Sequence, residues 1–176
     1  MAAILTIGGS PSAVSRSSAV LEYARAQIGR AGLEAEGLSV RDLPPEDLIF
    51  ARFGSPAIQE AQARVAAAQG VIVATPVYKA AYSGVLKTFL DLLPAGALAG
   101  KTVLPIATGG APTHMLALDY ALKPVLAALG AQQTLAGVYI LDAQIQTGEQ
   151  FVLDPALAGR LDEALAELVE AVRRGS

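Results

Sequence analysis

The sequence of 176 residues contains no cysteine, no tryptophan and one histidine, His114. Without cysteine the chain can form no disulfide, no thiolate nucleophile and no thiolate metal site. A single histidine makes a histidine-based metal site unexpected. These absences argue against enzymes with a cysteine nucleophile and against metal sites built from cysteine or histidine.

Charged residues and long hydrophobic runs are also scarce. Asp, Glu, Lys and Arg make up 16% of the chain, against about 25% in typical domains. So few charges cannot easily cover a whole surface, and we expect part of it to pack against another subunit. The net charge of −3 argues against nucleic acid or an anionic membrane as a partner. With no run near the ~20 apolar residues of a membrane span and no signal peptide, we expect a cytoplasmic protein.

The chain does contain a regular alternation of strand-like and helix-like runs, within a length that suits one domain, 1–176. The predicted strands are 3–7, about 34–40, 70–74, 101–107 and about 134–141, and the predicted helices are about 16–30, 56–69, 84–93, 113–129 and 155–173. Continuous apolar strands are typical of parallel sheets covered on both faces. The predicted fold class is α/β, with a flavodoxin-like doubly wound five-stranded parallel sheet and helices on both faces.

The loops after the first, third and fourth predicted strands should meet at the carboxyl edge of this sheet, where ligands bind. They read GGSP at 8–11, TPVYK at 75–79 and TGGAP at 108–112. All three are rich in small, turn-forming or hydroxyl residues, and none carries a carboxylate. Loops this bare let a flat ligand approach the backbone closely.

The first of these loops leads into a helix through a cluster of hydroxyl residues. The cluster consists of Ser10, Ser12, Ser15, Ser17 and Ser18, with Arg16 among them. The N-terminus of a helix presents unpaired N–H groups and a positive dipole end, which suit a phosphate group. Helix capping alone needs one or two serines. We therefore favour a phosphate site over capping alone.

The loop matches neither the P-loop pattern nor the G-x-G-x-x-G dinucleotide pattern. A phosphatase of this architecture would need a cysteine here, and a phospho-acceptor receiver domain would need acidic residues after the first strand. A single phosphate on a flat ring system fits best, and FMN is the obvious candidate. Pro76, Val77 and Tyr78 would give the ring a short rigid wall.

At these residues the sequence resembles the NADPH-dependent FMN reductases, especially the reductase components of two-component alkanesulfonate monooxygenase systems. The resemblance covers most of the chain, and its middle stretch is the most specific part. It is carried by GSP with SRSS, PEDLIFARFGSPA, GVIVATPVYKAAYSGVLKTFLDLLP, GKTVLPIATGG and LDYALKPVLAALGA.

The resemblance implies that NADPH or NADH reduces FMN, and that reduced FMN passes transiently to a separate monooxygenase. It also implies a homotetramer with flavin sites near subunit contacts. The implied FMN contacts are Ser10, Ser15, Arg16, Ser17 and Ser18 for the phosphate, and Pro76, Val77, Tyr78, Lys79, Thr108, Gly109 and Gly110 for the ring. Ser12 stands where the family commonly has an arginine, which leaves the choice between NADPH and NADH open. We assign no role to 142–154.

Pro124 lies inside the predicted helix 113–129 and has no N–H, so the carbonyl of Tyr120 loses its usual partner. Either a kink or a π-bulge absorbs such a defect. The family carries a tyrosine here in a π-helix at the subunit interface, which implies a role for Tyr120 in flavin exchange and assembly. The simpler interpretation is an interface residue beside a kink. This helix is apolar nearly all round, which favours burial against a second subunit.

Two other functions would use some of the same residues. His114 with Ser10 would suggest a serine hydrolase, but the G-x-S-x-G elbow is absent because residue 12 is serine. A flavodoxin-type electron carrier would hold FMN tightly, often between aromatic rings, and aromatic residues make up only 5% of this chain. Hydride transfer from nicotinamide C4 to flavin N5 needs no protein nucleophile, which suits loops without catalytic carboxylates.

Overall fold

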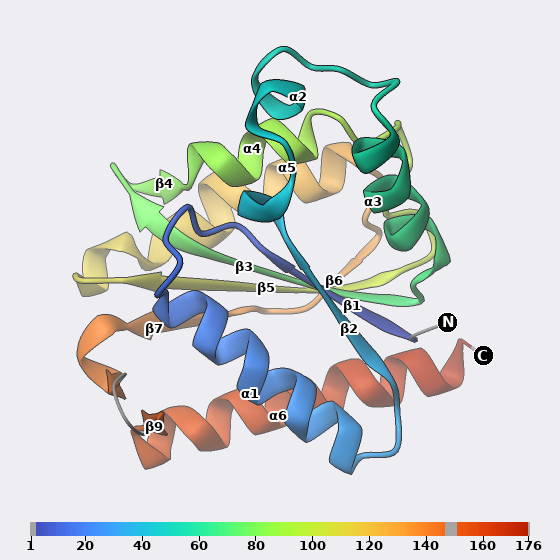
Figure 1. Ribbon diagram of the computed structural model, residues 1–176. Coiled ribbons are helices and arrows are strands. Elements are labelled where there is room, and N and C mark those ends of the chain that lie inside the picture. Colours follow the sequence, from blue (N-terminus) through green and yellow to red (C-terminus); the bar gives the residue numbers. More distant parts are fainter. Residues whose placement is uncertain (1–2, 147–150, 176) are drawn as a thin grey trace.

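A computed structural model describes residues 3–146 and 151–175. Its centre is a parallel sheet with the strand order β2–β1–β3–β5–β6 (Figure 1). β7 also pairs with β5, further along that strand than β6 does. These strands are β1 (Ile4–Gly8), β2 (Ala35–Ser39), β3 (Gly70–Tyr78), β5 (Thr102–Gly109), β6 (Gln133–Thr134) and β7 (Val138–Leu141). This is the strand order of flavodoxin-like sheets, so the predicted fold class is confirmed.

Helices cover both faces of the sheet (Figure 1). One layer consists of α1 (Arg16–Arg30) and α6 (Pro155–Arg174), and the other of α3 (Pro56–Ala67), α4 (Gly84–Leu90) and α5 (Lys123–Ala128). Each layer packs its own buried apolar cluster against the sheet. The leucines of α6 at 157, 161, 165 and 168 are all buried, as their helical spacing predicts. Within the described ranges, no helix combines the length and apolar character needed to cross a bilayer.

Several short elements escape the sequence patterns. They are the 3₁₀ turn η1 (Val40–Asp42), α2 (Pro45–Ile49), β4 (Ala81–Tyr82), the 3₁₀ turn η4 (Asp142–Gln144), β8 (Ile145–Gln146) and β9 (Val152–Leu153). β4 pairs antiparallel with the end of β3, and β8 pairs with β9 in a separate two-stranded sheet. Elements of two to five residues are too short to show a hydrophobic period, so the patterns could not predict them.

The predicted strand 134–141 is wrong as a single element, because the structure divides it into β6 and β7. β6 pairs with Thr102 and Val103 of β5, and β7 resumes opposite Ile106. The break lies beside Pro105, which has no N–H to give to a neighbouring strand. Gly137 makes the turn with a φ of 88°, and a Cβ there would lie 2.9 Å from the Pro105 carbonyl oxygen.

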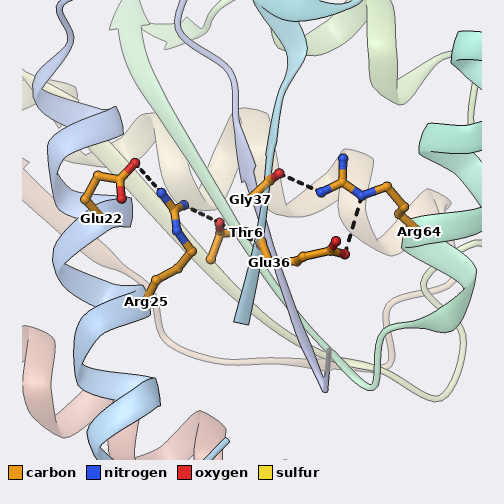
Figure 2. Close-up of polar contacts among 6 residues, drawn as sticks. All are labelled: Thr6, Glu22, Arg25, Glu36, Gly37 and Arg64. Carbon is orange, nitrogen blue, oxygen red and sulfur yellow. Dashed lines mark hydrogen bonds and ion pairs between the residues drawn. The ribbon is translucent and has the colours of Figure 1, made fainter. Parts of the chain in front are cut away.

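Two arginines tie neighbouring helices to β1 and β2 (Figure 2). Arg64 donates to the carbonyl of Gly37 at 2.6 Å, and its Nε lies 3.5 Å from the carboxylate of Glu36. Arg25 donates to the hydroxyl of Thr6 at 2.8 Å, and that hydroxyl donates to the Glu36 carbonyl at 3.0 Å. An edge strand exposes unpaired backbone groups that invite another strand. Arg64 therefore protects the outer edge of β2. Arg25 ties α1 to β1, whose end leads into the serine cluster.

Candidate functional site

A cleft of about 240 Å³ lies at the carboxyl edge of the sheet. Its lining residues are Ser10, Ser12, Val14, Ser15, Arg16, Pro76, Val77, Tyr78, Thr108, Gly109, Gly110 and Asp142. The three segments predicted as strand-end loops therefore meet in one place. The structure extends β3 to Tyr78 and β5 to Gly109, so the last residues of these strands, and not only loops, line the cleft. A larger groove of about 520 Å³ runs between α1 and α6, but helix side chains such as Gln27 and Arg173 line it rather than strand ends.

Three of the predicted ligand residues do not line this cleft. Ser17 is buried, and its hydroxyl shares a hydrogen bond of 2.9 Å with that of Ser15. Ser18 lines a separate hollow between α1 and β2. Lys79 is exposed in the turn between β3 and β4, with a φ of 50°. The hydroxyl groups of Ser17 and Ser18 therefore do not face the cleft.

The serine cluster orders its own loop as well as lining the cleft. Ser15 is the N-cap of α1, and its hydroxyl oxygen accepts from the N–H of Ser18 at 3.4 Å. The hydroxyl of Ser10 accepts from the N–H of Ser12 at 3.2 Å, and the Ser12 hydroxyl donates to the Val14 carbonyl at 2.7 Å. Capping thus explains Ser15, and turn formation explains part of the remaining serine content.

The two glycines after β5 have different roles. A Cβ on Gly109 would collide with the hydroxyl of Tyr139, which donates to the carbonyl of Ala111 at 2.7 Å. Burial, and then the charge of Asp142, raise the pKa of Tyr139. A Cβ on Gly110 would meet nothing closer than the Asp142 carboxylate at 3.8 Å. Gly109 is therefore required by packing within the chain, whereas Gly110 keeps the border of the cleft open.

Buried hydroxyl groups behind the cleft join the first and third strand ends. The hydroxyl oxygen of Thr75 accepts from the N–H of Ser83 at 3.0 Å. The Ser83 hydroxyl donates to the carbonyl of Gly9 and accepts from the N–H of Leu86 at 3.0 Å. A Cβ on Gly9 would lie 2.7 Å from that of Leu86. α4 therefore packs directly on the backbone that leads into the serine cluster, and this holds Ser10 and Pro76 next to their neighbours Gly9 and Thr75 in the same arrangement.

Sequence reasoning missed Val14 and Asp142 as lining residues. Asp142 follows β7 directly, and its Oδ2 lies 4.0 Å from Nη1 of Arg16. The predicted site consisted of the loops after the first, third and fourth strands, and none of those carries a carboxylate. Asp142 directly follows the predicted strand 134–141. Because every parallel strand of the sheet ends at the same edge, that position could have predicted Asp142 as a lining residue.

The predicted single helix 113–129 is wrong, because the segment divides into three. A 3₁₀ turn (Pro112–Met115) is followed by a π-helix (Leu118–Leu122) and by α5. The N–H of Lys123 bonds to the carbonyl of Leu118, five residues earlier. The defect before Pro124 is thus absorbed by a π-helix rather than by a kink. Tyr120 lies in this π-helix with 80% of its surface exposed, outside the lining of the cleft.

The strand order and the cleft of hydroxyl, glycine and proline residues define a flavodoxin-like α/β protein with a strand-end ligand site. The family model for NADPH-dependent FMN reductase matches residues 2–146. FMN reductases (NADPH) of Pseudomonas putida and Escherichia coli are 53% and 51% identical over 174 residues, which cover 97% of this chain and 88% and 90% of those proteins.

A crystal structure of the apo form of an NADH:FMN oxidoreductase (EmoB) superposes with a TM-score of 0.85 at 37% identity, covering 97% of this chain and 90% of that one. The chain therefore belongs to the NADPH-dependent FMN reductase family. It is an oxidoreductase of NAD(P)H and FMN, and the resemblance found in the sequence is confirmed.

Proposed function

We propose that the cleft binds FMN as an exchangeable substrate and that reduced FMN leaves it for a separate flavin-dependent sulfonate monooxygenase. One observation carries the site assignment. The N-terminus of α1 with Ser10, Ser15 and Arg16 lines the same cleft of about 240 Å³ as the strand end that holds Pro76 and Tyr78. A phosphate group and a flat ring on one ligand would use both kinds of lining.

The residues present fit this ligand. Arg16 begins a helix of 15 residues, so its guanidinium and the helix dipole together would hold a phosphate dianion. Pro76 has few accessible conformations and Val77 is branched, which gives the ring a stiff wall. Gly110 leaves the opposite border open. The likeness to alkanesulfonate-system reductases supports the choice of partner.

FMN, when bound, would supply the hydride acceptor, and the chemistry of hydride transfer belongs to the two cofactors. The chain's part is to bind, orient and exclude water. The backbone at Gly109 and Gly110 borders the cleft, where N–H groups would stabilise negative charge that develops on the ring. Tyr78, half exposed at the end of β3, would cover the ring or give way to the nicotinamide.

We also infer a homotetramer. Met115 and Leu116 are each 55% exposed, and they lie just before the π-helix that holds the exposed Tyr120. Large apolar side chains gathered on one short segment favour an interface over a solvated surface. The family resemblance supports the same surface and the tetrameric state. Light scattering of the purified protein tests this directly: a monomer at micromolar concentration would contradict it.

The phosphate site is tested by Arg16→Ala. A charge-assisted hydrogen bond contributes about 1.5–3 kcal/mol, so FMN should bind at least about tenfold more weakly, whereas riboflavin, which has no phosphate, should bind almost unchanged. Flavin fluorescence quenching measures both affinities. Arg174→Ala, at an exposed arginine near the end of α6, is the matched control. Equal losses for the two flavins would show that Arg16 does not contact the phosphate.

Exchangeable binding is tested by turnover. Steady-state oxidation of NADPH should depend on added free FMN, and the purified protein should carry little colour. A tightly held cofactor would instead give yellow protein whose NADPH oxidation is independent of added FMN. That second result would place the chain with electron carriers and would contradict release of reduced FMN to a monooxygenase.

A further inference from the structure

Arg16 and Asp142 face each other in the cleft. They come from the start of α1 and the end of β7, 126 positions apart in the chain, and Nη1 and Oδ2 lie 4.0 Å apart. Their side chains are 47% and 39% exposed. Of the described residues that line the cleft, these are the only two with charged side chains. The lining is therefore close to neutral, although the proposed ligand carries a phosphate.

The Asp142 carboxylate lies beside Arg16 in the cleft, where it would repel a bound phosphate group. It lies near the open border at Gly110, within 3.8 Å of the place of a Cβ there, and it neutralises the guanidinium that would hold the phosphate. An exposed ion pair of this length adds little to folding stability. Because the Arg16–Asp142 pair lines the cleft, we expect its loss to change ligand affinity more than it changes the free energy of unfolding.

We propose that Asp142 weakens the hold of Arg16 on the FMN phosphate and thereby keeps the flavin exchangeable. The proposal rests on the proposed function and names the residue that sets the affinity of its site. Asp142 is a positioning residue, because it acts through Arg16. In the free protein the guanidinium pairs with Asp142, and an arriving phosphate must compete with that carboxylate for it.

The proposal is tested with Asp142→Asn, which keeps the size and removes the charge. FMN should bind about two- to fivefold more tightly, the range that corresponds to one half-exposed ion pair, and riboflavin should bind as before. Reduced FMN should dissociate more slowly, so that both kcat and KM for free FMN fall. Asp142→Glu retains the charge and should behave like the wild-type protein.

Glu170→Gln is the control, since Glu170 forms a pair of similar length with Arg174, 3.9 Å, near the end of α6, more exposed and away from the cleft. A double-mutant cycle adds Arg16→Ala, and in that background Asp142→Asn should change FMN affinity by less than about twofold. Unchanged or weaker FMN binding by Asp142→Asn, equal tightening of riboflavin, or an undiminished effect without Arg16 would overturn the proposal. If Arg16→Ala weakens both flavins equally, the phosphate site itself fails instead.

Discussion

The hydroxyl group of Tyr139 occupies the space that a side chain on Gly109 would need, and it donates to the carbonyl of Ala111 at 2.7 Å. Tyr139 belongs to β7 and Gly109 ends β5. A tyrosine on the outer strand thus shapes the border of the cleft by packing against the neighbouring strand end.

Gly109→Ala should destabilise the fold by about 1–3 kcal/mol, the usual cost of overpacking a filled site. Tyr139→Phe alone should cost about 0.5–1.5 kcal/mol through the lost hydrogen bond. Combined, the two changes should cost less than their sum, because the phenylalanine makes room for the new methyl group. Urea denaturation measures all three. Gly110→Ala, where a Cβ would make only an ordinary contact with the Asp142 carboxylate at 3.8 Å, should leave stability unchanged. Strict additivity would mean that the hydroxyl does not restrict Gly109.

Stability should fall in alkali through Tyr139. Its pKa is raised above 10.0 by burial and by Asp142, so the folded state favours the neutral phenol. Its contribution is complete below the unfolded pKa of about 10 and is lost as the pH rises through the folded value. Denaturant titrations between pH 8 and pH 11 should show a smaller decline for Tyr139→Phe than for the wild type. Tyr23, Tyr82 and Lys87, whose pKa values are also raised, should contribute to the remaining decline.

Ser12→Arg should raise the preference for NADPH over NADH. Ser12 is exposed in the loop that leads into α1, and Arg41 already donates to the neighbouring Pro11 carbonyl at 3.3 Å. A second guanidinium that reaches the 2′-phosphate would add a charge-assisted hydrogen bond, so the ratio of kcat/KM values should rise by roughly tenfold. Ser12→Gln, which adds length without charge, should change the ratio little. An unchanged ratio in Ser12→Arg would show that this loop does not contact the 2′-phosphate.

Tyr120→Ala, or deletion of Tyr120 to restore a regular helix, should yield protein that retains flavin and turns over free FMN poorly. The reason is that the π-helix (Leu118–Leu122) is the irregular element beside β4, and π-helices favour functional sites. The visible spectrum, light scattering and FMN turnover measure the three effects. Leu116→Ser, at an exposed position outside the π-helix, separates assembly from exchange. Colourless variants with wild-type turnover and assembly would reject a functional role for Tyr120.

Much of the fold, and the edge of the sheet at which the cleft lies, could be predicted from the sequence. Local periodicity identifies α1 and α6, and continuous apolar runs identify β1, β3 and β5, because both signals come from residues close together in the chain. The carboxyl edge of the sheet follows from that alternation. The irregularity near Tyr120 could also be predicted, because Pro124 removes a donor from its own helix; the choice of a π-helix over a kink could not.

The contacts among side chains at that edge could not be predicted from the sequence. Asp142 lies beside Arg16, Tyr139 dictates the glycine at 109, and Ser83 bonds to the carbonyl of Gly9. Each pair joins residues far apart in the chain, and its geometry depends on the register of strands and on how helices pack over them. A hydrophobic pattern reports which face of an element is buried, whereas a contact across strand ends depends on where separate elements stop relative to each other.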